Sequence, residues 1–106
     1  MKETTVQALK ARIDSGDTDF VLLDVREAWE CQIAALPNAT HIPMGQIPSR
    51  INELPKDREI VVYCHHGGRS AQVTHHLIRN GFDRAMNLAG GIDAWSREID
   101  NQIARY

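Results

Sequence analysis

The sequence predicts an α/β fold in which a parallel sheet of four to five strands carries helices on both faces. Two continuous apolar runs, at residues 20–25 and 60–63, lack the polar alternation of a half-exposed strand and are typical of strands buried on both faces. Segments with the apolar spacing of a helix separate the predicted strands, so strands and helices alternate along the chain. This order implies right-handed crossovers between parallel strands.

Length and composition fit a single domain that spans residues 1–106, with one core that needs no disulfide or metal. A formal net charge of −2 gives no reason to expect nucleic acid or an acidic membrane as a partner. No apolar run approaches the roughly 20 residues that span a bilayer, and the amino-terminal residues lack the apolar segment of a signal peptide. We therefore expect a cytoplasmic protein in which Cys31 and Cys64 are free thiols.

The chain is expected to begin with a weakly indicated strand at residues 2–4 and a helix that ends at Gly16. Thr4 and Gln7 have the spacing of a capping box. The apolar residues of this helix share one face: Val6, Leu9 and Ile13. The apolar run from Phe20 to Val25 then forms the first strongly predicted strand.

A short helix over residues 27–33 is expected next, with Trp29 and Ile33 facing the core. Pro37-Asn38 form a turn that leads into a short strand at residues 40–42. The following helix has a proline near its start, a proline beyond its end and three apolar residues on one face: Pro48, Pro55, Ile47, Ile51 and Leu54.

The strongest pattern in the sequence is the buried strand at residues 60–63, followed by a polar loop and a helix from Ser70. Gly67 and Gly68 permit a sharp turn between them, and Gly81 ends the helix. Its apolar positions are Val73, Leu77 and Ile78. A last short strand at residues 86–88 and the pair Gly90-Gly91 lead into a helix with one apolar face: Ile92, Trp95, Ile99 and Ile103.

Cys64 lies at the point where this central strand ends and the polar loop begins. Free backbone N–H groups and the positive end of the helix dipole converge at such a junction and favour an anion. A thiol placed there is expected to have a lowered pKa and to react as a thiolate. An ordinary buried cysteine is the plainer alternative, but it leaves the two glycines, Arg69 and the helix start unexplained.

The segment Cys64-His65-His66-Gly67-Gly68-Arg69-Ser70 resembles the active-site loop of rhodanese-type sulfurtransferases, in which four residues separate a cysteine from an arginine. Three further segments, at residues 23–27, 36–43 and 88–95, are similar to the family's other motifs and stand in the same order. Each motif alone is weak evidence, but the four together are specific. The resemblance covers nearly the whole chain and implies the family's α/β fold.

The resemblance implies a role for each residue of the loop. Cys64 would be the catalytic nucleophile, and the remaining loop residues would bind the substrate: His65, His66, Gly67, Gly68, Arg69 and Ser70. Arg69 would also brace the loop, with Asp24 as its partner, although Asp24 is equally well interpreted as a turn cap. Arg26 would face the site and hold the sulfonate end of a donor, its alternative being a surface arginine.

Two histidines stand where thiosulfate users of the family often carry lysine or arginine. Because histidine is only partly charged at neutral pH, we do not expect a strong preference for thiosulfate. A zinc site built from Cys64, His65, His66, His75 and His76 is not expected, since adjacent histidines point apart and paired ligand spacing is missing. Cys31 is interpreted as a half-buried helix cysteine and not as a resolving thiol.

The expected activity is therefore transfer of a sulfane sulfur, from thiosulfate or a persulfide, through a Cys64 persulfide to cyanide, a thiol or a protein acceptor. No cofactor or metal is expected. One alternative is a cysteine phosphatase or arsenate reductase, which has five residues between its cysteine and arginine where this loop has four. A non-catalytic binding module of the same fold is the other alternative.

Overall fold

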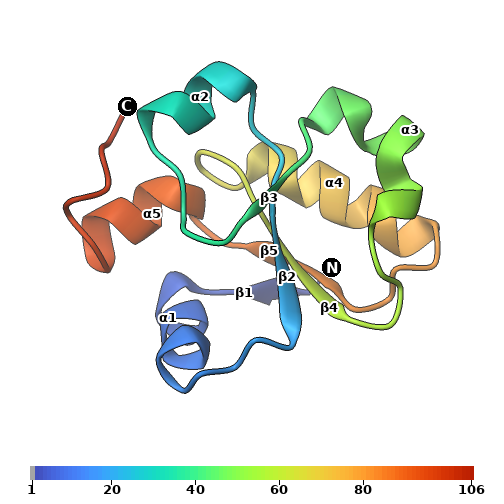
Figure 1. Cartoon of the computed structure of the whole chain (residues 1–106), viewed down its shortest axis with the longest axis horizontal. Coiled ribbons are helices and arrows are strands. Elements are labelled where there is room, and N and C mark those ends of the chain that lie inside the picture. Colours follow the sequence, from blue (N-terminus) through green and yellow to red (C-terminus); the bar gives the residue numbers. More distant parts are fainter. Residues whose placement is uncertain (1) are drawn as a thin grey trace.

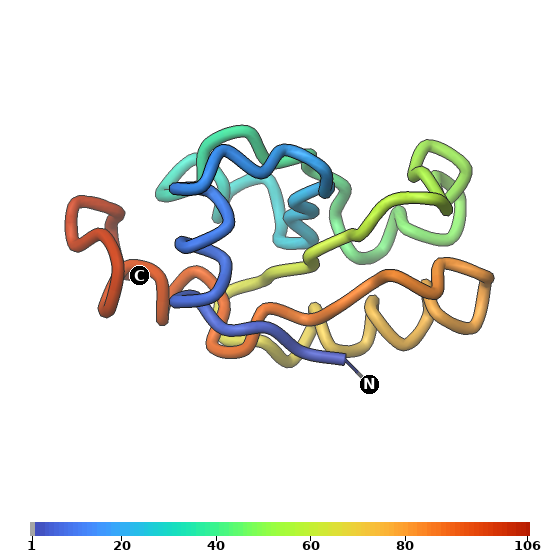
Figure 2. Tube along the Cα trace, turned by 90° about the horizontal axis from the view of Figure 1, so that it is seen from below, coloured from blue at the N-terminus to red at the C-terminus, as the bar shows by residue number. Residues whose placement is uncertain are grey.

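The structure is a computed structural model and describes residues 2–106. Five parallel strands form one sheet in the order β1-β5-β4-β2-β3, with helices packed against it (Figure 1). The strands are β1 (Glu3–Thr4), β2 (Phe20–Asp24), β3 (Thr40–His41), β4 (Glu59–Tyr63) and β5 (Ala85–Leu88). The predicted α/β fold and parallel sheet are confirmed, and so is the weakly indicated first strand, which runs alongside β5 (Figure 2).

The helices are α1 (Val6–Asp14), α2 (Ala28–Ile33), α3 (Ile47–Arg50), α4 (Gly68–Arg79) and α5 (Gly91–Glu98). Within residues 2–106, no helix is long and apolar enough to cross a membrane. The chain returns at its carboxyl end to lie beside α2 (Figure 1), so the last residues meet a helix from the first third of the sequence.

Two hydrophobic cores lie on opposite faces of the sheet, and β4 contributes to both. Ile60 and Val62 pack into the core that α3 and α4 cover. Val61 and Tyr63 pack into the core that α1 and α5 cover. All four side chains are fully buried, which explains why this strand has no polar alternation in the sequence.

Two details of α1 differ from the prediction. Thr5, and not Thr4, caps the helix, because its hydroxyl accepts a hydrogen bond from the Ala8 N–H at 3.1 Å while Thr4 is already paired in β1. Ile13 is 42% exposed, although Val6 and Leu9 are buried as expected. The helix therefore contacts the core only through its first two turns.

The predicted inward face of α2 is wrong. Trp29 is 60% exposed and Ile33 is 45% exposed, while Glu30 is buried. The helix turns a carboxylate inward because Glu30 pairs with Arg69 in the first turn of α4. Its N-terminus is held by a capping box formed by Glu27 and Glu30.

The helix expected around residues 47–54 is divided into three short pieces. The helix α3 is flanked by 3-10 turns at Met44–Gln46 and Ile51–Glu53. Ile47 and Leu54 are nevertheless buried in the predicted core. The short turns therefore bring the same apolar residues into the core that one longer helix would have brought there.

Candidate active site

The site is built where β4 ends and α4 begins, and Cys64 directly follows the strand. Gly67 adopts a left-handed backbone with φ 118°, which lets the chain turn back toward the sulfur. Gly91 packs so closely behind the loop that an added Cβ would lie 2.5 Å from the Cys64 carbonyl oxygen. The first backbone N–H groups of α5 hold the loop from this side, since Ile92 donates to the Cys64 carbonyl and Asp93 to the His65 carbonyl, both at 3.0 Å.

The Cys64 sulfur is buried and surrounded by hydrogen-bond donors. The backbone N–H groups of Gly67 and Ser70 donate to Sγ at 3.1 and 3.4 Å, and the Ser70 hydroxyl lies 3.3 Å from it. Burial alone would raise the pKa of Cys64, but these bonds and one from the His66 N–H outweigh it and lower the pKa. The site therefore favours a sulfur anion, as the sequence indicated.

Arg69 is paired with Glu30 and not with Asp24, which corrects the expected partner. Its two terminal nitrogens donate to the two carboxylate oxygens of Glu30 at 2.6 and 2.8 Å. This bidentate pair joins the first turn of α4 to α2. The hydrogen bond from Arg69 is the largest of the effects that lower the pKa of Glu30 to about 2, so the carboxylate is ionised at neutral pH.

Arg26 does not face the site, which corrects the expected role of holding a sulfonate. Its side chain is 0% exposed, and it donates to both oxygens of Asp24 at 2.6 and 2.9 Å. Further bonds reach the Ala34 carbonyl at 2.8 Å and the Tyr106 hydroxyl at 2.9 Å. A donor molecule cannot reach this guanidinium, and Asp24 braces Arg26 instead of the loop.

Tyr106 is a site residue that the sequence reasoning missed. Its ring stacks on His65, with centroids 3.9 Å apart and planes 5° from parallel. Its hydroxyl donates to Glu30 at 2.7 Å and accepts from Arg26. Burial raises the pKa of Tyr106 to about 12, so the hydroxyl stays protonated and serves as this donor. No local spacing marks a tyrosine that follows the last helix as part of a site.

Cys31 lies beside the buried Asp24 and not in the loop. Its thiol lies 3.4 Å from Asp24 Oδ2 and donates a hydrogen bond to it. Burial and the negative charge of Asp24 raise the pKa of Cys31 to about 11. The pKa values of the two cysteines are therefore shifted in opposite directions, which favours the thiolate form of Cys64 and the thiol form of Cys31.

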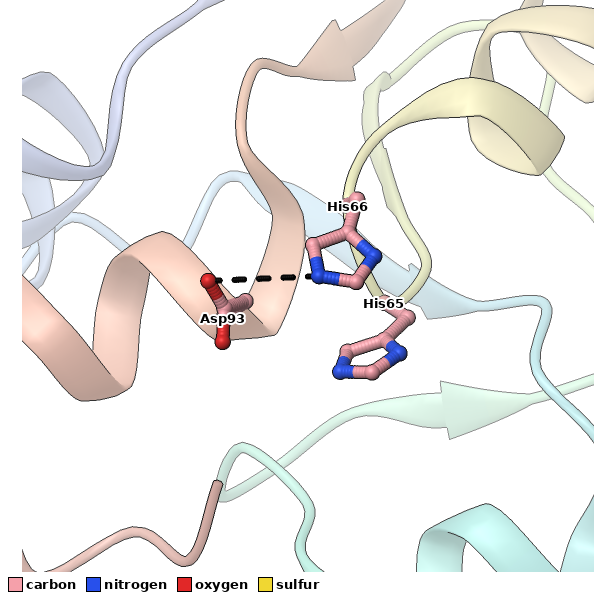
Figure 3. Close-up of side chains that lie close together, drawn as sticks. All are labelled: His65, His66 and Asp93. Carbon is pink, nitrogen blue, oxygen red and sulfur yellow. Dashed lines mark ion pairs between the residues drawn. The ribbon is translucent and has the colours of Figure 1, made fainter. Parts of the chain in front are cut away.

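His65, His66 and Asp93 offer metal-ligand atoms within 4.8 Å of one another (Figure 3). The carboxylate of Asp93 is already bound by Arg97 at 3.0 Å and Arg105 at 3.1 Å. A divalent cation would meet two guanidinium groups there, so this set of donors fits a metal poorly.

The histidine pair of α4 lies elsewhere. His75 and His76 line a separate groove of about 590 Å³ between α4 and the α3 region, together with Arg79 and with apolar residues such as Met44. His75 and His76 therefore do not lie beside Cys64, as a zinc site built from the two histidine pairs and Cys64 would require.

Comparison with known proteins identifies the family of this chain. The sequence pattern of the rhodanese-like domain matches residues 5–98. The chain is 42% identical to a sulfurtransferase of Allochromatium vinosum, covering 92% of this chain and 90% of that one, and 41% identical to the putative sulfurtransferase YtwF of Bacillus subtilis, covering 92% and 93%. The crystal structure of SSP1007 from Staphylococcus saprophyticus superposes with a TM-score of 0.84 at 36% identity, covering 93% of this chain and 97% of the other.

Proposed function

Because the chain belongs to the rhodanese-like domain family, we propose that it is a sulfurtransferase in which Cys64 carries the transferred sulfur as a persulfide. The observation that carries this proposal is the set of hydrogen bonds to the Cys64 sulfur from Gly67 and Ser70. They stabilise negative charge on a buried sulfur.

In the loading step, the Cys64 thiolate attacks the outer sulfur of a sulfane donor. A new S–S bond forms at Cys64, and the bond between the outer sulfur and the rest of the donor breaks. The leaving group takes the bonding electron pair, as sulfite from thiosulfate or as a thiolate from a persulfide. The negative charge then lies on the added outer sulfur, where the same backbone N–H groups stabilise it.

In the unloading step, a thiophilic acceptor such as cyanide or a thiol attacks the terminal sulfur, and the Cys64 thiolate leaves. A thiol of lowered pKa is a better leaving group in this exchange. The same hydrogen bonds from Gly67 and Ser70 therefore assist both halves of the cycle.

Two other functions receive less support. A phosphatase loop must wrap a tetrahedral oxyanion, whereas here the Gly67 and Ser70 N–H groups close directly on the sulfur. A pure docking module has no use for a thiol of lowered pKa.

The test is turnover with cyanide as acceptor and either thiosulfate or a persulfide as donor, measured as thiocyanate released. The wild-type protein should turn over, and Cys64→Ser should not, while its thermal melt matches the wild type. Hydrolysis of an aryl phosphate serves as the control reaction. Efficient phosphate hydrolysis without thiocyanate release would rule out the proposed function.

A further inference from the structure

We propose that the sulfur donor of this site is a persulfide that reacts in its protonated form, RSSH, in preference to the thiosulfate dianion, because the positive charges around Cys64 are already paired with carboxylates. This inference rests on the proposed function and specifies the donor for the same site. It is carried by three sets of paired charges.

The first pair involves Arg69, the loop cation that interacts electrostatically with Cys64. Both terminal nitrogens of its guanidinium are bound by Glu30 at 2.6 and 2.8 Å. Tyr106 adds a third hydrogen bond to the same carboxylate and holds it in place. Arg69 and Glu30 together carry no net charge, so the loop offers an incoming dianion little attraction.

The second pair is Arg26 with Asp24, which lies completely inside the protein. The side chain of Arg26 is 0% exposed and that of Asp24 is 2% exposed. The guanidinium is neutralised by this carboxylate and cannot turn outward without breaking a buried ion pair. The second arginine that could have held a sulfonate is thus unavailable to a donor.

The third set lies on the other side of the loop, where the histidines meet α5. His66 approaches Asp93 at 4.0 Å (Figure 3). Arg97 bonds to Asp93 and Glu98, and Arg105 bonds to Asp93, so two guanidinium groups are matched by two carboxylates.

His65, beside that set, is covered by the Tyr106 ring. Burial and the neighbouring His66 lower the pKa of His65, which keeps its ring mostly neutral. Among residues 2–106, the contacts of the loop therefore leave no unpaired arginine or lysine beside Cys64.

The two donors differ most in the charge they bring to this neutral site. Thiosulfate places two negative charges beside the Cys64 thiolate and releases sulfite, a second dianion. Burying such charges is costly where no cation compensates them. For the persulfide, the thiolate attacks the outer sulfur of H–S–S–R, Cys64–S–S–H forms, and RS⁻ leaves with the electron pair. The protonated persulfide brings no charge into the site, and even its ionised form carries one negative charge where thiosulfate carries two.

The test measures how fast each donor adds a sulfur atom to the protein, by intact mass in single-turnover reactions. The donors are thiosulfate and the persulfide of 2-mercaptoethanol, whose organic group is uncharged. Persulfides are also intrinsically more reactive, so the informative quantity is the ratio of the thiosulfate rate to the persulfide rate in each variant.

Glu30→Gln is the first variant, because glutamine keeps the shape and the bond to the Glu27 N–H while it releases the charge of Arg69. Its ratio should rise about tenfold over the wild type. Glu53→Gln is the matched control, since Glu53 holds Arg50 in an equivalent bidentate pair on the surface, outside the loop and its contacts. The ratio of this control should equal that of the wild type.

His66→Arg is the second variant and does not depend on Glu30. The side chain of His66 is 67% exposed, so an arginine fits there and adds a cation beside the loop. Its ratio should also rise about tenfold, and added salt should reduce this gain.

A ratio that stays at the wild-type value in both Glu30→Gln and His66→Arg would overturn the inference, as would a wild type that loads faster from thiosulfate. A structural disturbance alone would slow both donors and leave the ratio unchanged. If neither donor loads Cys64 in any protein, the proposed function itself fails, which is a different result.

Discussion

Cys64 and Cys31 illustrate how surroundings decide the chemistry of a residue. Four hydrogen-bond donors around Cys64 lower its pKa, while burial and Asp24 raise the pKa of Cys31 to about 11. The sequence indicated the first environment, because a strand end, two glycines and a helix start are local features. It could not show the second, since Asp24 is brought to Cys31 by the turn between β2 and α2.

Removing the Ser70 hydroxyl should destabilise the thiolate form of Cys64. A hydrogen bond to a charged group contributes about 1.5 kcal/mol, so Ser70→Ala should slow loading at neutral pH about tenfold. The pH at which alkylation of Cys64 reaches half its maximal rate should rise, because loss of a donor to the anion raises the pKa. Iodoacetamide kinetics from pH 5 to pH 10 measure this midpoint, and an unchanged midpoint would show that the hydroxyl does not stabilise the thiolate.

Cys31 should be dispensable for sulfur transfer. Its thiol is protonated at neutral pH and hydrogen-bonded to Asp24, so it is a poor nucleophile toward a persulfide. Cys31→Ala should keep at least about half of the turnover and lose about 1 kcal/mol of stability from the small cavity. Thiocyanate release and urea unfolding measure the two quantities. Collapse of turnover in a folded variant would support a resolving thiol instead.

Among the elements, α2 braces the start of α4, because Glu30 of α2 pairs with Arg69. The sequence placed this helix correctly but predicted that Trp29 and Ile33 face the core, because apolar residues usually do. The structure turns Glu30 inward instead, toward Arg69 of α4. Asp24 and Glu30 lie only six positions apart, and no spacing rule tells which of them Arg69, 39 positions after Glu30, will meet.

The Glu30–Arg69 pair should make stability depend on pH. The pKa of Glu30 is depressed from 4.5 to about 2 in the folded protein, so the pair stabilises the fold above pH 4.5 and this contribution is lost as pH falls toward 2. Glu30→Gln should therefore lose about 2 kcal/mol at pH 7 and much less near pH 2. Urea unfolding at both pH values tests this, and a difference that stays constant with pH would contradict it.

The length of the loop between β4 and α4 should set which chemistry the site performs. Four residues separate Cys64 from Arg69, which brings the Gly67 and Ser70 N–H groups onto the sulfur. One glycine inserted between Gly67 and Gly68 should reduce sulfur transfer about a hundredfold, since a misplacement of about 1 Å has that effect. The same insertion should improve binding of phosphate or arsenate. Calorimetry on folded protein measures the binding, and unimpaired sulfur transfer would show that loop length is not decisive.

Across the whole molecule, the sequence predicted the features that local patterns encode. Apolar periodicity placed β2 and β4, and the glycine pairs marked the turns before α4 and α5. Contacts between segments that are distant in the chain could not be predicted from the sequence. Tyr106 bonds to Glu30 across 76 positions and stacks on His65, and together these contacts join the carboxyl end of the chain to the loop. Such contacts depend on how the elements pack and leave no mark in the spacing of residues.

Mass spectrometry can decide whether Cys64 carries the transferred sulfur. Incubation with a persulfide or with thiosulfate, followed by removal of excess donor, should make the intact protein one sulfur atom heavier. Peptide mapping should locate that atom on Cys64, cyanide should remove it, and Cys64→Ser should not acquire it. If the Cys64→Ser variant gains the sulfur as readily as the wild type, or if the sulfur is found on Cys31, then Cys64 is not the sulfur carrier.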